Sequence, residues 1–170
     1  MTTNNGGNTQ PNAGADAQHQ AGPGMNILAQ YIKDFSFENP NSPKSLQQRE
    51  NTPPLNIHVN VNANPMGKDE FEVMLILQAK AGEGEDMLFN VEVTYAGMFR
   101  IQNVPEEHVH PFVLIECPRM LFPFARQIVA DATRNGGFPP LMVDPIDFAA
   151  LYRHNLAQSN AQGGGEAGNA

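Results

Sequence analysis

Residues 118–152 read PRMLFPFARQIVADATRNGGFPPLMVDPIDFAALY, and this stretch decides much of the fold. Apolar residues recur at helical spacing over 123–134, and the glycines that follow can end this helix in a left-handed cap. FPPLMV (138–143) must be extended, because two prolines exclude helix. Asp144 followed by a proline is typical of the start of another helix. The stretch therefore predicts two helices joined by an extended loop.

A further helix is predicted just before this stretch. Pro105 and the two acidic residues after it resemble a first helical turn, since acidic side chains suit the positive end of the helix dipole. Pro111 limits or kinks this helix, because proline lacks a backbone donor and clashes with the preceding turn. We expect this helix to end at Pro118 and the next one to begin at Pro123.

Upstream of the helices the chain alternates apolar and polar residues with the period of a β-strand. The alternating segments are YIKDFSFE (31–38), LNIHVNVNA (55–63), EFEVMLILQAKA (70–81) and MLFNVEVTYAGMFRI (87–101). Short connections between successive strands favour an antiparallel meander. Strands followed by helices indicate an α+β protein, in which helices pack on one face of a four-stranded antiparallel sheet.

The two ends of the chain have a composition that cannot contribute to a core. Residues 1–24 and 158–170 are rich in Asn, Gln, Gly and Ala and contain no aromatic residue. Such segments bury too little apolar surface to offset the entropy of ordering them. We expect two disordered polar tails around one domain, residues 25–157, which is a usual length for a single core.

The chain is acidic, with 18 Asp and Glu residues against 10 Lys and Arg and a net charge of −8. Asp16 and Glu166 are the only acidic residues in the predicted tails, so the domain itself carries −6. Binding to nucleic acid or anionic lipid needs clustered basic residues, so neither partner is expected. A basic protein segment is the expected electrostatic partner.

The sequence also indicates a compartment. Cys117 is the only cysteine, so no internal disulfide is possible and nothing requires an oxidising environment. The N-terminal residues lack the basic and apolar regions of a signal peptide. No apolar stretch approaches the roughly 20 residues that span a bilayer. We expect a cytoplasmic protein that does not insert into the membrane.

The residues that could carry catalysis or bind a metal do not form a recognised pattern. His108 and His110 lie near acidic residues, but they lack the i, i+4 spacing of a helical zinc site. Cys117 lies in an apolar run, where a lone cysteine is usually a small buried residue. The chain has no G-x-S-x-G elbow, P-loop or dinucleotide fingerprint. We expect no enzyme activity, no catalytic residue, no metal and no cofactor.

Four blocks of the sequence resemble the SecB family of bacterial export chaperones. They are YIKDFSFENPNSP (31–43), VEVTYAGMF (91–99), PRMLFPFAR (118–126) and GGFPPLMVDPIDFAALY (136–152), and their order and spacing agree with the family. The resemblance implies a SecB-like sheet with helices on one side, assembled as a homotetramer that is a dimer of dimers. It also implies a chaperone that binds unfolded precursor proteins, keeps them translocation-competent and delivers them to the SecA translocation ATPase.

The resemblance places a client-binding groove along the segments rich in Phe and Pro. The residues expected near it are Phe112, Leu121, Phe122, Phe124, Leu141 and Met142. A large exposed apolar surface generally marks an interaction site, and methionine adapts to varied sequences. The alternative is that these side chains fill the core or the subunit interface. Helical spacing favours that alternative for Leu121 and Phe124, whereas Phe122 is the better candidate for the groove.

The resemblance also implies two contact surfaces on the sheet. Asp34, Glu38, Asn90 and Glu92 match the family's SecA-contact positions, although the family often has an apolar residue in place of Asn90. Positions that join dimers into the tetramer are matched by Phe89, Val91 and Val93. The alternatives are that the polar residues only keep an exposed face soluble, and that the apolar residues only face the core.

Two other functions remain open from the sequence. The first is a chaperone of the same fold that serves a toxin–antitoxin system, for which client binding without SecA affinity would be the sign. The second is a small α+β ligand-binding protein or hydrolase that uses the His and Glu residues around His108. A stoichiometric bound metal, or activity lost in His108→Ala with the fold intact, would be needed to support it.

Overall fold

The computed structural model describes residues 22–163 of the 170-residue chain. Its elements are β1 (Gly24–Glu38), a 3₁₀ turn (Lys44–Leu46), β2 (Leu55–Gly67), β3 (Glu70–Ala81), a second 3₁₀ turn (Gly84–Asp86), β4 (Phe89–Gln102), α1 (Glu106–Asn135) and α2 (Phe148–Gly163). The predicted tails fall largely on residues 1–21 and 164–170, outside the described part. The predicted domain boundaries therefore stay predictions, although β1 already begins at Gly24 and α2 continues past residue 158.

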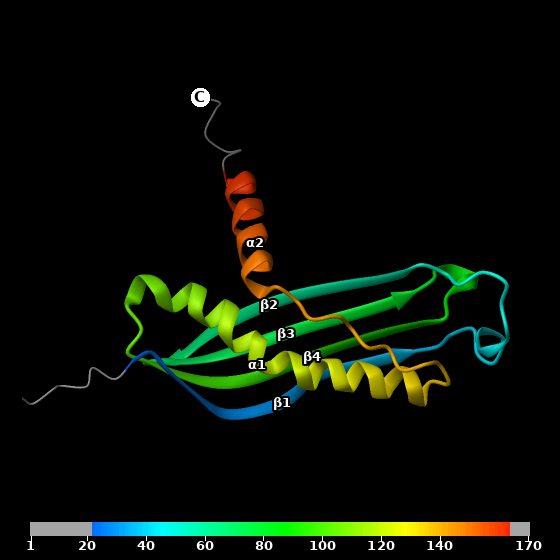
Figure 1. Ribbon diagram of the computed structural model, residues 1–170, viewed down its shortest axis with the longest axis horizontal. Helices are drawn as coiled ribbons and strands as arrows, with labels where there is room; N and C mark the ends of the chain where they lie inside the picture. The colour runs from blue at the N-terminus through cyan, green and yellow to red at the C-terminus, as the bar shows by residue number, and fades with distance from the viewer. Residues whose placement is uncertain (1–21, 164–170) are drawn as a thin grey trace, which may run out of the picture.

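The four strands form one antiparallel sheet in the order β1-β4-β3-β2 (Figure 1). The predicted meander is confirmed for β2, β3 and β4, which follow one another through short turns. For β1 the prediction is wrong, because β1 pairs with β4 at the edge opposite β2. The connection from β1 to β2, residues 39–54, is long enough to cross the end of the sheet, so neighbours in sequence need not be neighbours in space.

Helix α1 is continuous through Pro111, Pro118 and Pro123, so the predicted break between the last two prolines is wrong. The buried face of the helix explains the difference. Every fourth residue from Val113 to Val129 is buried, and most of these side chains are fully enclosed. Full burial of one such side chain contributes roughly 1.5–3 kcal/mol, against about 3 kcal/mol lost for a proline inside a helix. Packing on the sheet thus outweighs the tendency of the prolines to end the helix.

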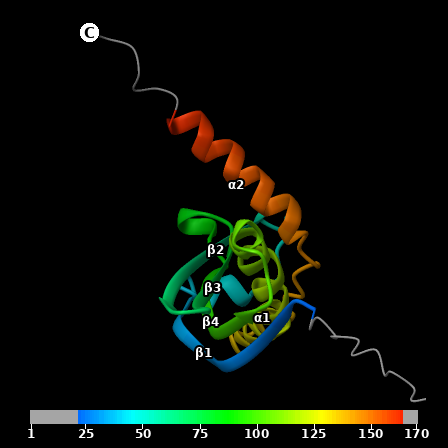
Figure 2. The ribbon, with the colours of Figure 1, turned by 90° about the vertical axis from the view of Figure 1, so that its left-hand side faces the viewer.

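The segment after α1 crosses the helix-covered face of the sheet and leads into α2 (Figure 1). Residues 138–143 contain no helix, as Pro139 and Pro140 predicted, and residues 144–147 contain none either. Helix α2 begins later than expected from Asp144, because Asp147 caps it: Asp147 Oδ1 accepts a hydrogen bond from the Ala150 N–H at 2.9 Å. The rest of α2 projects away from the body formed by the sheet and α1 (Figures 1 and 2).

The core lies between α1 and one face of the sheet. Its fully buried strand residues are Val73, Leu75, Leu77 and Ala79 of β3 and Val91, Val93 and Phe99 of β4. The described helices pack on this face, which we call the helix side (Figure 2). The alternate residues of the same strands point to the opposite face, which we call the outer side. The predicted fold, an α+β protein with helices on one face of a four-stranded antiparallel sheet, is confirmed.

Candidate binding surfaces

The outer side brings together the polar residues predicted on the first and last strands. The β1–β4 ladder pairs Glu38 with Asn90, Ser36 with Glu92 and Asp34 with Thr94. Side chains alternate between faces along a strand, so Asp34 and Glu38 project on the same side as Asn90 and Glu92. Asp34 and Glu38 are exposed, whereas Asn90 and Glu92 are half-buried. The four residues thus form one polar surface, which we call the acidic patch.

Few contacts neutralise the acidic patch. Gln78 of β3 lies opposite Glu92, and its Nε2 donates a long hydrogen bond of 3.4 Å to Asn90 Oδ1. Among residues 22–163, the ion pairs within 4.0 Å do not include Asp34, Glu38 or Glu92. These three carboxylates can therefore attract a basic partner, in a manner that salt should weaken.

A second polar cluster on the sheet ties β1 to β3 across β4. Glu72 Oε1 accepts hydrogen bonds from Tyr31 Oη and Lys33 Nζ, both at 2.7 Å. The bond from Lys33, followed by the bond from Tyr31, lowers the pKa of Glu72, and the hydrogen bond to Glu72 in turn raises the pKa of Tyr31. Because Glu72 is buried and paired, its charge stabilises the sheet rather than adding to the acidic patch.

Phe89, Val91 and Val93 lie on the helix side of β4, inside the core of a single chain. Val91 and Val93 are fully buried, and Phe89 lies between two rings, with centroids 6.2 Å from Phe37 and 5.2 Å from Phe138. Within the single chain these three side chains expose little or no surface. Their part in a contact between chains stays a prediction.

The residues predicted for the client groove differ widely in exposure. Leu121 and Phe122 are buried, Phe112 and Leu141 are half-buried, and Phe124 and Met142 are 49% and 52% exposed. The Phe122 ring packs edge-on against Phe148, with 6.1 Å between the ring centroids. Phe122, which the sequence favoured for the client groove, is thus buried in the core of the single chain. Phe124 instead stacks on Tyr95 at 5.8 Å and keeps half of its surface in solvent.

Another groove, whose residues were not among those predicted, lies where three loops meet at one end of the sheet. Its apolar lining is formed by Leu46, Leu88, Phe138 and Pro139 around a hollow of about 230 Å³. Gly137, with a φ of +90°, passes so close to Leu46 that an added Cβ would lie 3.0 Å from the Leu46 side chain. Leu46 remains 47% exposed, so the groove is open to solvent. We call it the loop groove.

A larger hollow of about 440 Å³ opens beside Gly136, the residue before Gly137. Its lining comes from Phe35 and Phe37 of β1 and from Ile128, Ala132 and Asn135 of α1, with Asp131 and Gly136. An added Cβ at Gly136 would collide with the Phe37 ring, so glycine is what lets the end of α1 approach β1 this closely. We call this the β1–α1 hollow.

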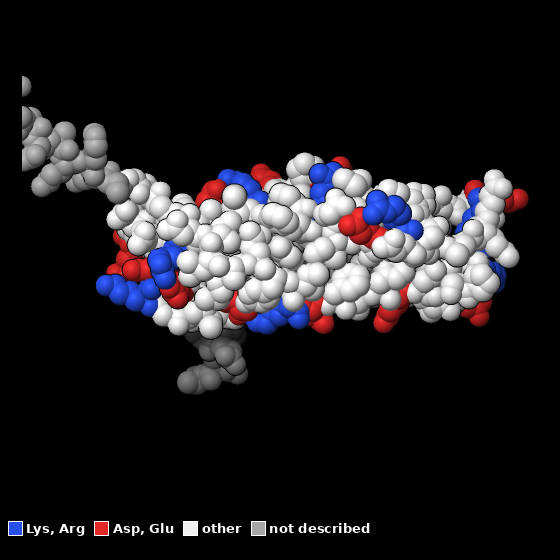
Figure 3. Space-filling model, turned by 90° about the horizontal axis from the view of Figure 1, so that it is seen from below, with Lys and Arg blue, Asp and Glu red and all other residues white. Residues whose placement is uncertain are grey.

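Apolar surface continues from the β1–α1 hollow along both elements. The large exposed apolar residues of β1 and α1 include Ile27, Leu28, Ile32, Phe35, Met120 and Phe124. Figure 3 shows a broad uncharged band on the side of the molecule that carries β1 and the second half of α1, with the charged residues mostly along its margins. Exposed apolar area of this extent generally marks an interaction surface.

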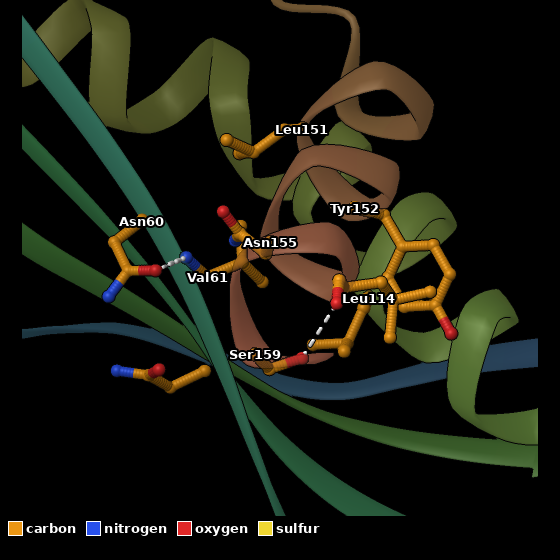
Figure 4. Close-up of a pocket in the computed structure, with 9 residues that line it drawn as sticks. Asn60, Val61, Leu114, Leu151, Tyr152, Asn155 and Ser159 are labelled. Atoms are coloured by element: carbon orange, nitrogen blue, oxygen red, sulfur yellow. Dashed lines mark hydrogen bonds between the residues drawn. The ribbon is translucent and has the colours of Figure 1, made fainter. Parts of the chain in front are cut away.

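A third hollow, of about 280 Å³, separates α2 from β2 (Figure 4). It is lined by Asn60, Val61 and Asn62 of β2, Leu114 of α1, and Leu151, Tyr152, Asn155, Leu156 and Ser159 of α2. Tyr152 Oη lies 3.2 Å from His110 Nδ1 of α1, which ties the first turns of α2 to the body. The start of α2 therefore faces the middle of β2 across this hollow.

The groups that could have suggested an active site do not converge in residues 22–163. No three His, Cys, Asp or Glu residues in that range lie close enough to hold a metal ion. The Cys117 thiol is buried and lies 3.6 Å from Met25 Sδ, and burial raises its pKa to about 12. A thiol that stays protonated at neutral pH is a poor nucleophile.

Sequence comparison relates these surfaces to a family. Residues 18–159 match SecB, described as the preprotein translocase subunit SecB. The chain is 54% identical over 159 residues to the protein-export protein SecB of Rhodopseudomonas palustris strain HaA2, which covers 94% of this chain and 97% of that protein. It is 56% identical over 162 residues to the protein of the same name from Sinorhizobium medicae, with coverage of 95% and 94%.

Among solved structures, the fold is similar to that of the SecB-like chaperone of Mycobacterium tuberculosis, determined in complex with a ChAD peptide from an antitoxin. The TM-score is 0.54 and the identity 18%, over 72% of this chain and 90% of that chain. At this identity the likeness shows the fold alone. None of the helices in residues 22–163 is long and apolar enough to cross a membrane.

Proposed function

The chain belongs to the SecB family of protein-export chaperones, and we propose that it keeps unfolded precursor proteins translocation-competent by binding them on its helix side. The observation that carries the proposal is the open loop groove, where Leu46, Leu88 and Phe138 present apolar side chains beside Gly137. An unfolded chain exposes apolar side chains that a folded protein buries, so such a surface selects the unfolded state. Binding and release require no covalent step.

The construction of the loop groove suits clients of varied sequence. Leu46, Leu88 and Phe138 come from three separate loops, and loops adjust more readily than strands or helices. Met142, on the segment that follows the groove, adds a flexible and exposed apolar side chain. Many weak apolar contacts of this kind hold an unfolded chain without demanding one sequence.

The acidic patch is our proposed contact site for SecA, to which the chaperone would deliver its clients. Asp34, Glu38 and Glu92 gather negative charge on the outer side, and the domain as a whole is acidic. A basic segment of SecA would be attracted to this charge, chiefly through a faster association that salt screens. Because the patch and the loop groove lie on opposite sides of the sheet, one chaperone could hold a client and contact SecA together.

The exposed apolar band on β1 and α1 supports the proposed assembly, a homotetramer that is a dimer of dimers in the cytoplasm. Ile32, Phe35 and Phe124 leave apolar surface in water, and a second copy would cover it. In this proposal these residues contact another chain, in addition to the predicted contacts Phe89, Val91 and Val93.

The toxin–antitoxin alternative is not favoured. The SecB-like chaperone solved with an antitoxin peptide is 18% identical to this chain, whereas the protein-export relatives are 54–57% identical over most of it. A hydrolase using His108 finds no support in the described residues, where no group of metal ligands forms.

The proposed client surface can be tested with one substitution and a matched control. Leu46→Asp places a charge in the loop groove, and Leu156→Asp places the same charge at a similarly exposed leucine of α2. We expect Leu46→Asp to weaken binding of an unfolded precursor about tenfold or more, because the charge must be desolvated against the client. Affinity and particle mass are measured by titration and light scattering, with the same precursor in folded form as the negative control. Equal affinities for both variants, or equal binding of folded and unfolded precursor, would contradict the proposal.

A further inference from the structure

Strand β1 carries a single basic residue, Lys33, which comes directly before Asp34 of the acidic patch. The β1–β4 ladder has a register shift between Ile32 and Asp34, so Lys33 is an extra residue without a partner on β4. Such a bulge interrupts the alternation of side chains along a strand. Lys33 and Asp34 therefore both project on the outer side, where Lys33 contacts Glu72 and Asp34 lies beside Thr94. A cation thus stands next to a carboxylate that the proposed partner would need.

Lys33 does not neutralise Asp34, because its charge is held elsewhere. Its Nζ lies 2.7 Å from Oε1 of Glu72, which precedes the core residue Val73 and so projects on the outer side of β3. Among residues 22–163, no ion pair within 4.0 Å includes Asp34. The Glu72 side chain keeps only 10% of its surface in solvent, so water screens its attraction for Lys33 incompletely.

Tyr31 fixes the carboxylate that holds Lys33. Tyr31 Oη donates a second hydrogen bond of 2.7 Å to the same Oε1 of Glu72, so β1 holds this carboxylate from two positions. Both bonds cross β4, where the partner of Tyr31 is the small and fully buried Ala96. The bond from Lys33, followed by the bond from Tyr31, lowers the pKa of Glu72, so the charge that retains Lys33 is present at neutral pH.

Another basic residue that borders the acidic patch has a similar arrangement. Lys80 of β3 lies opposite Asn90, and its Nζ is 3.5 Å from Oε1 of Glu83, which follows the end of β3. The Glu83 side chain is 77% exposed, so this contact is long and open to solvent and contributes little. Lys33 is therefore the more firmly held of the two cations beside the acidic patch.

We propose that Glu72 is a positioning residue for the SecA contact: it holds Lys33 away from Asp34 and so keeps the acidic patch free to attract a basic segment. The inference rests on the proposed function and deepens it by naming what maintains the charge of that site. Without the Glu72 carboxylate, Lys33 turns to the adjacent Asp34, and the acidic patch attracts a cation less strongly. Glu72 thus acts through Lys33 rather than by touching the partner.

The main test compares the SecA affinity of two variants with that of the unmodified chaperone. Glu72→Gln removes the carboxylate and releases Lys33. The double variant Glu72→Gln with Lys33→Gln removes both charges and so keeps the net charge of the unmodified protein. We expect Glu72→Gln to weaken SecA binding about fivefold at about 0.1 M salt, and the added Lys33→Gln to restore the affinity to within about twofold.

The matched control is a second carboxylate on the outer side of β3. Glu70→Gln changes the net charge as Glu72→Gln does, and it releases Arg100, whose Nη2 lies 2.6 Å from Glu70 Oε1. Arg100 is six residues along β4 from Thr94, the neighbour of Asp34, which is about 20 Å in a strand. The Debye length is about 10 Å at about 0.1 M salt, so this control should change SecA affinity less than about twofold.

Urea unfolding of the same variants separates a positioning role from a structural one. The double variant has lost both partners of the contact between β1 and β3, so it cannot regain the stability that this contact provides. We expect its SecA affinity to recover while its stability does not. Recovery of affinity alone shows that the released charge of Lys33, rather than a loosened sheet, weakens binding in Glu72→Gln.

The outcomes separate this inference from the proposed function. Equal SecA affinities of Glu72→Gln and Glu70→Gln, or an affinity that Lys33→Gln fails to restore, would overturn the positioning role. In either case the proposed SecA contact stands if Asp34→Asn with Glu92→Gln still weakens binding. SecA that binds this double variant of the acidic patch as tightly as the unmodified protein would refute the contact site itself, and this inference with it.

Discussion

The two sides of the sheet are made from the same strands but in different ways. On the outer side, the acidic patch follows from the alternation of side chains along β1 and β4. Val91 and Glu92, for example, are consecutive residues that point to opposite faces of the sheet. On the helix side, the loop groove joins Leu46, Leu88 and Phe138, which are far apart in the sequence. The comparison shows how a small sheet can carry a charged surface on one side and an apolar surface on the other.

The largest expected effect compares neighbours that face the two sides. Leu77 is fully buried beneath the helices, whereas Gln78 points to the outer side. We expect Leu77→Ala to lower the free energy of unfolding by about 2–5 kcal/mol, because it leaves a cavity in the core. Gln78→Ala should cost at most about 1 kcal/mol, since it loses one long hydrogen bond to Asn90. Urea unfolding of both variants measures the difference, and equal losses would show that the two sides are not packed differently.

A smaller effect concerns the charge on the outer side. The double variant Asp34→Asn with Glu92→Gln removes two carboxylates of the acidic patch but keeps the shapes of the side chains. We expect SecA affinity to fall about tenfold at low salt and less at high salt, while client affinity stays unchanged. The control is Glu106→Gln with Glu107→Gln, which removes the same charge from the exposed first turn of α1. Equal loss of SecA affinity in the control would mean that net charge, rather than the acidic patch, governs binding.

The smallest predicted effect concerns the pH dependence of the Glu72 cluster. Its hydrogen bonds from Lys33 and Tyr31 lower the pKa of Glu72 below the ordinary value of 4.5, so the stability they add is complete above that pH. It should be lost as the pH falls through the lowered pKa, because the carboxyl group is then protonated in the folded state as well. We expect Glu72→Gln to lower the free energy of unfolding by about 1 kcal/mol at neutral pH. This figure is small because Lys33 is half exposed, and solvent screens its interaction with Glu72.

Urea unfolding from neutral pH to below pH 4 tests this prediction of a pH-dependent difference. The gap in stability between the unmodified protein and Glu72→Gln should close in acid. Glu38→Gln, at an exposed carboxylate on the same side, serves as the control and should change stability by less than about 0.5 kcal/mol. A gap that stays constant over this range would show that the Glu72 charge does not stabilise the fold.

Local sequence patterns predicted the strands and the outer side well for a physical reason. The alternation in LNIHVNVNA and in its neighbours is a property of the strand itself, and it fixes which residues share a face. The same local reasoning failed for Pro118 and Pro123, because packing of α1 on the sheet overrides the tendency of proline to end a helix. It also failed to place β1, since the pairing with β4 depends on contacts between distant segments.

The helix side could not be predicted to the same depth. Alternation placed Phe89, Val91 and Val93 on one face, but core residues and subunit contacts share that pattern; the fold adds that all three are buried within the single chain. Phe122 and Phe124 carried equally apolar side chains, yet only the three-dimensional packing buries one and exposes the other. Leu46 and Phe138 lie in loops without any period, so no sequence pattern indicated that they line one groove.

The most direct test of the account is whether one chaperone binds an unfolded precursor and SecA at the same time. The two surfaces lie on opposite sides of the sheet, so SecA should leave precursor affinity nearly unchanged. Analytical ultracentrifugation with a fluorescent precursor measures this, with Leu46→Asp and the Asp34→Asn, Glu92→Gln variant as single-site controls. The account predicts a ternary complex of chaperone, precursor and SecA. Leu46→Asp should lose the precursor and keep SecA, whereas Asp34→Asn with Glu92→Gln should lose SecA and keep the precursor. Displacement of the precursor by SecA, or loss of both partners in either control, would contradict it.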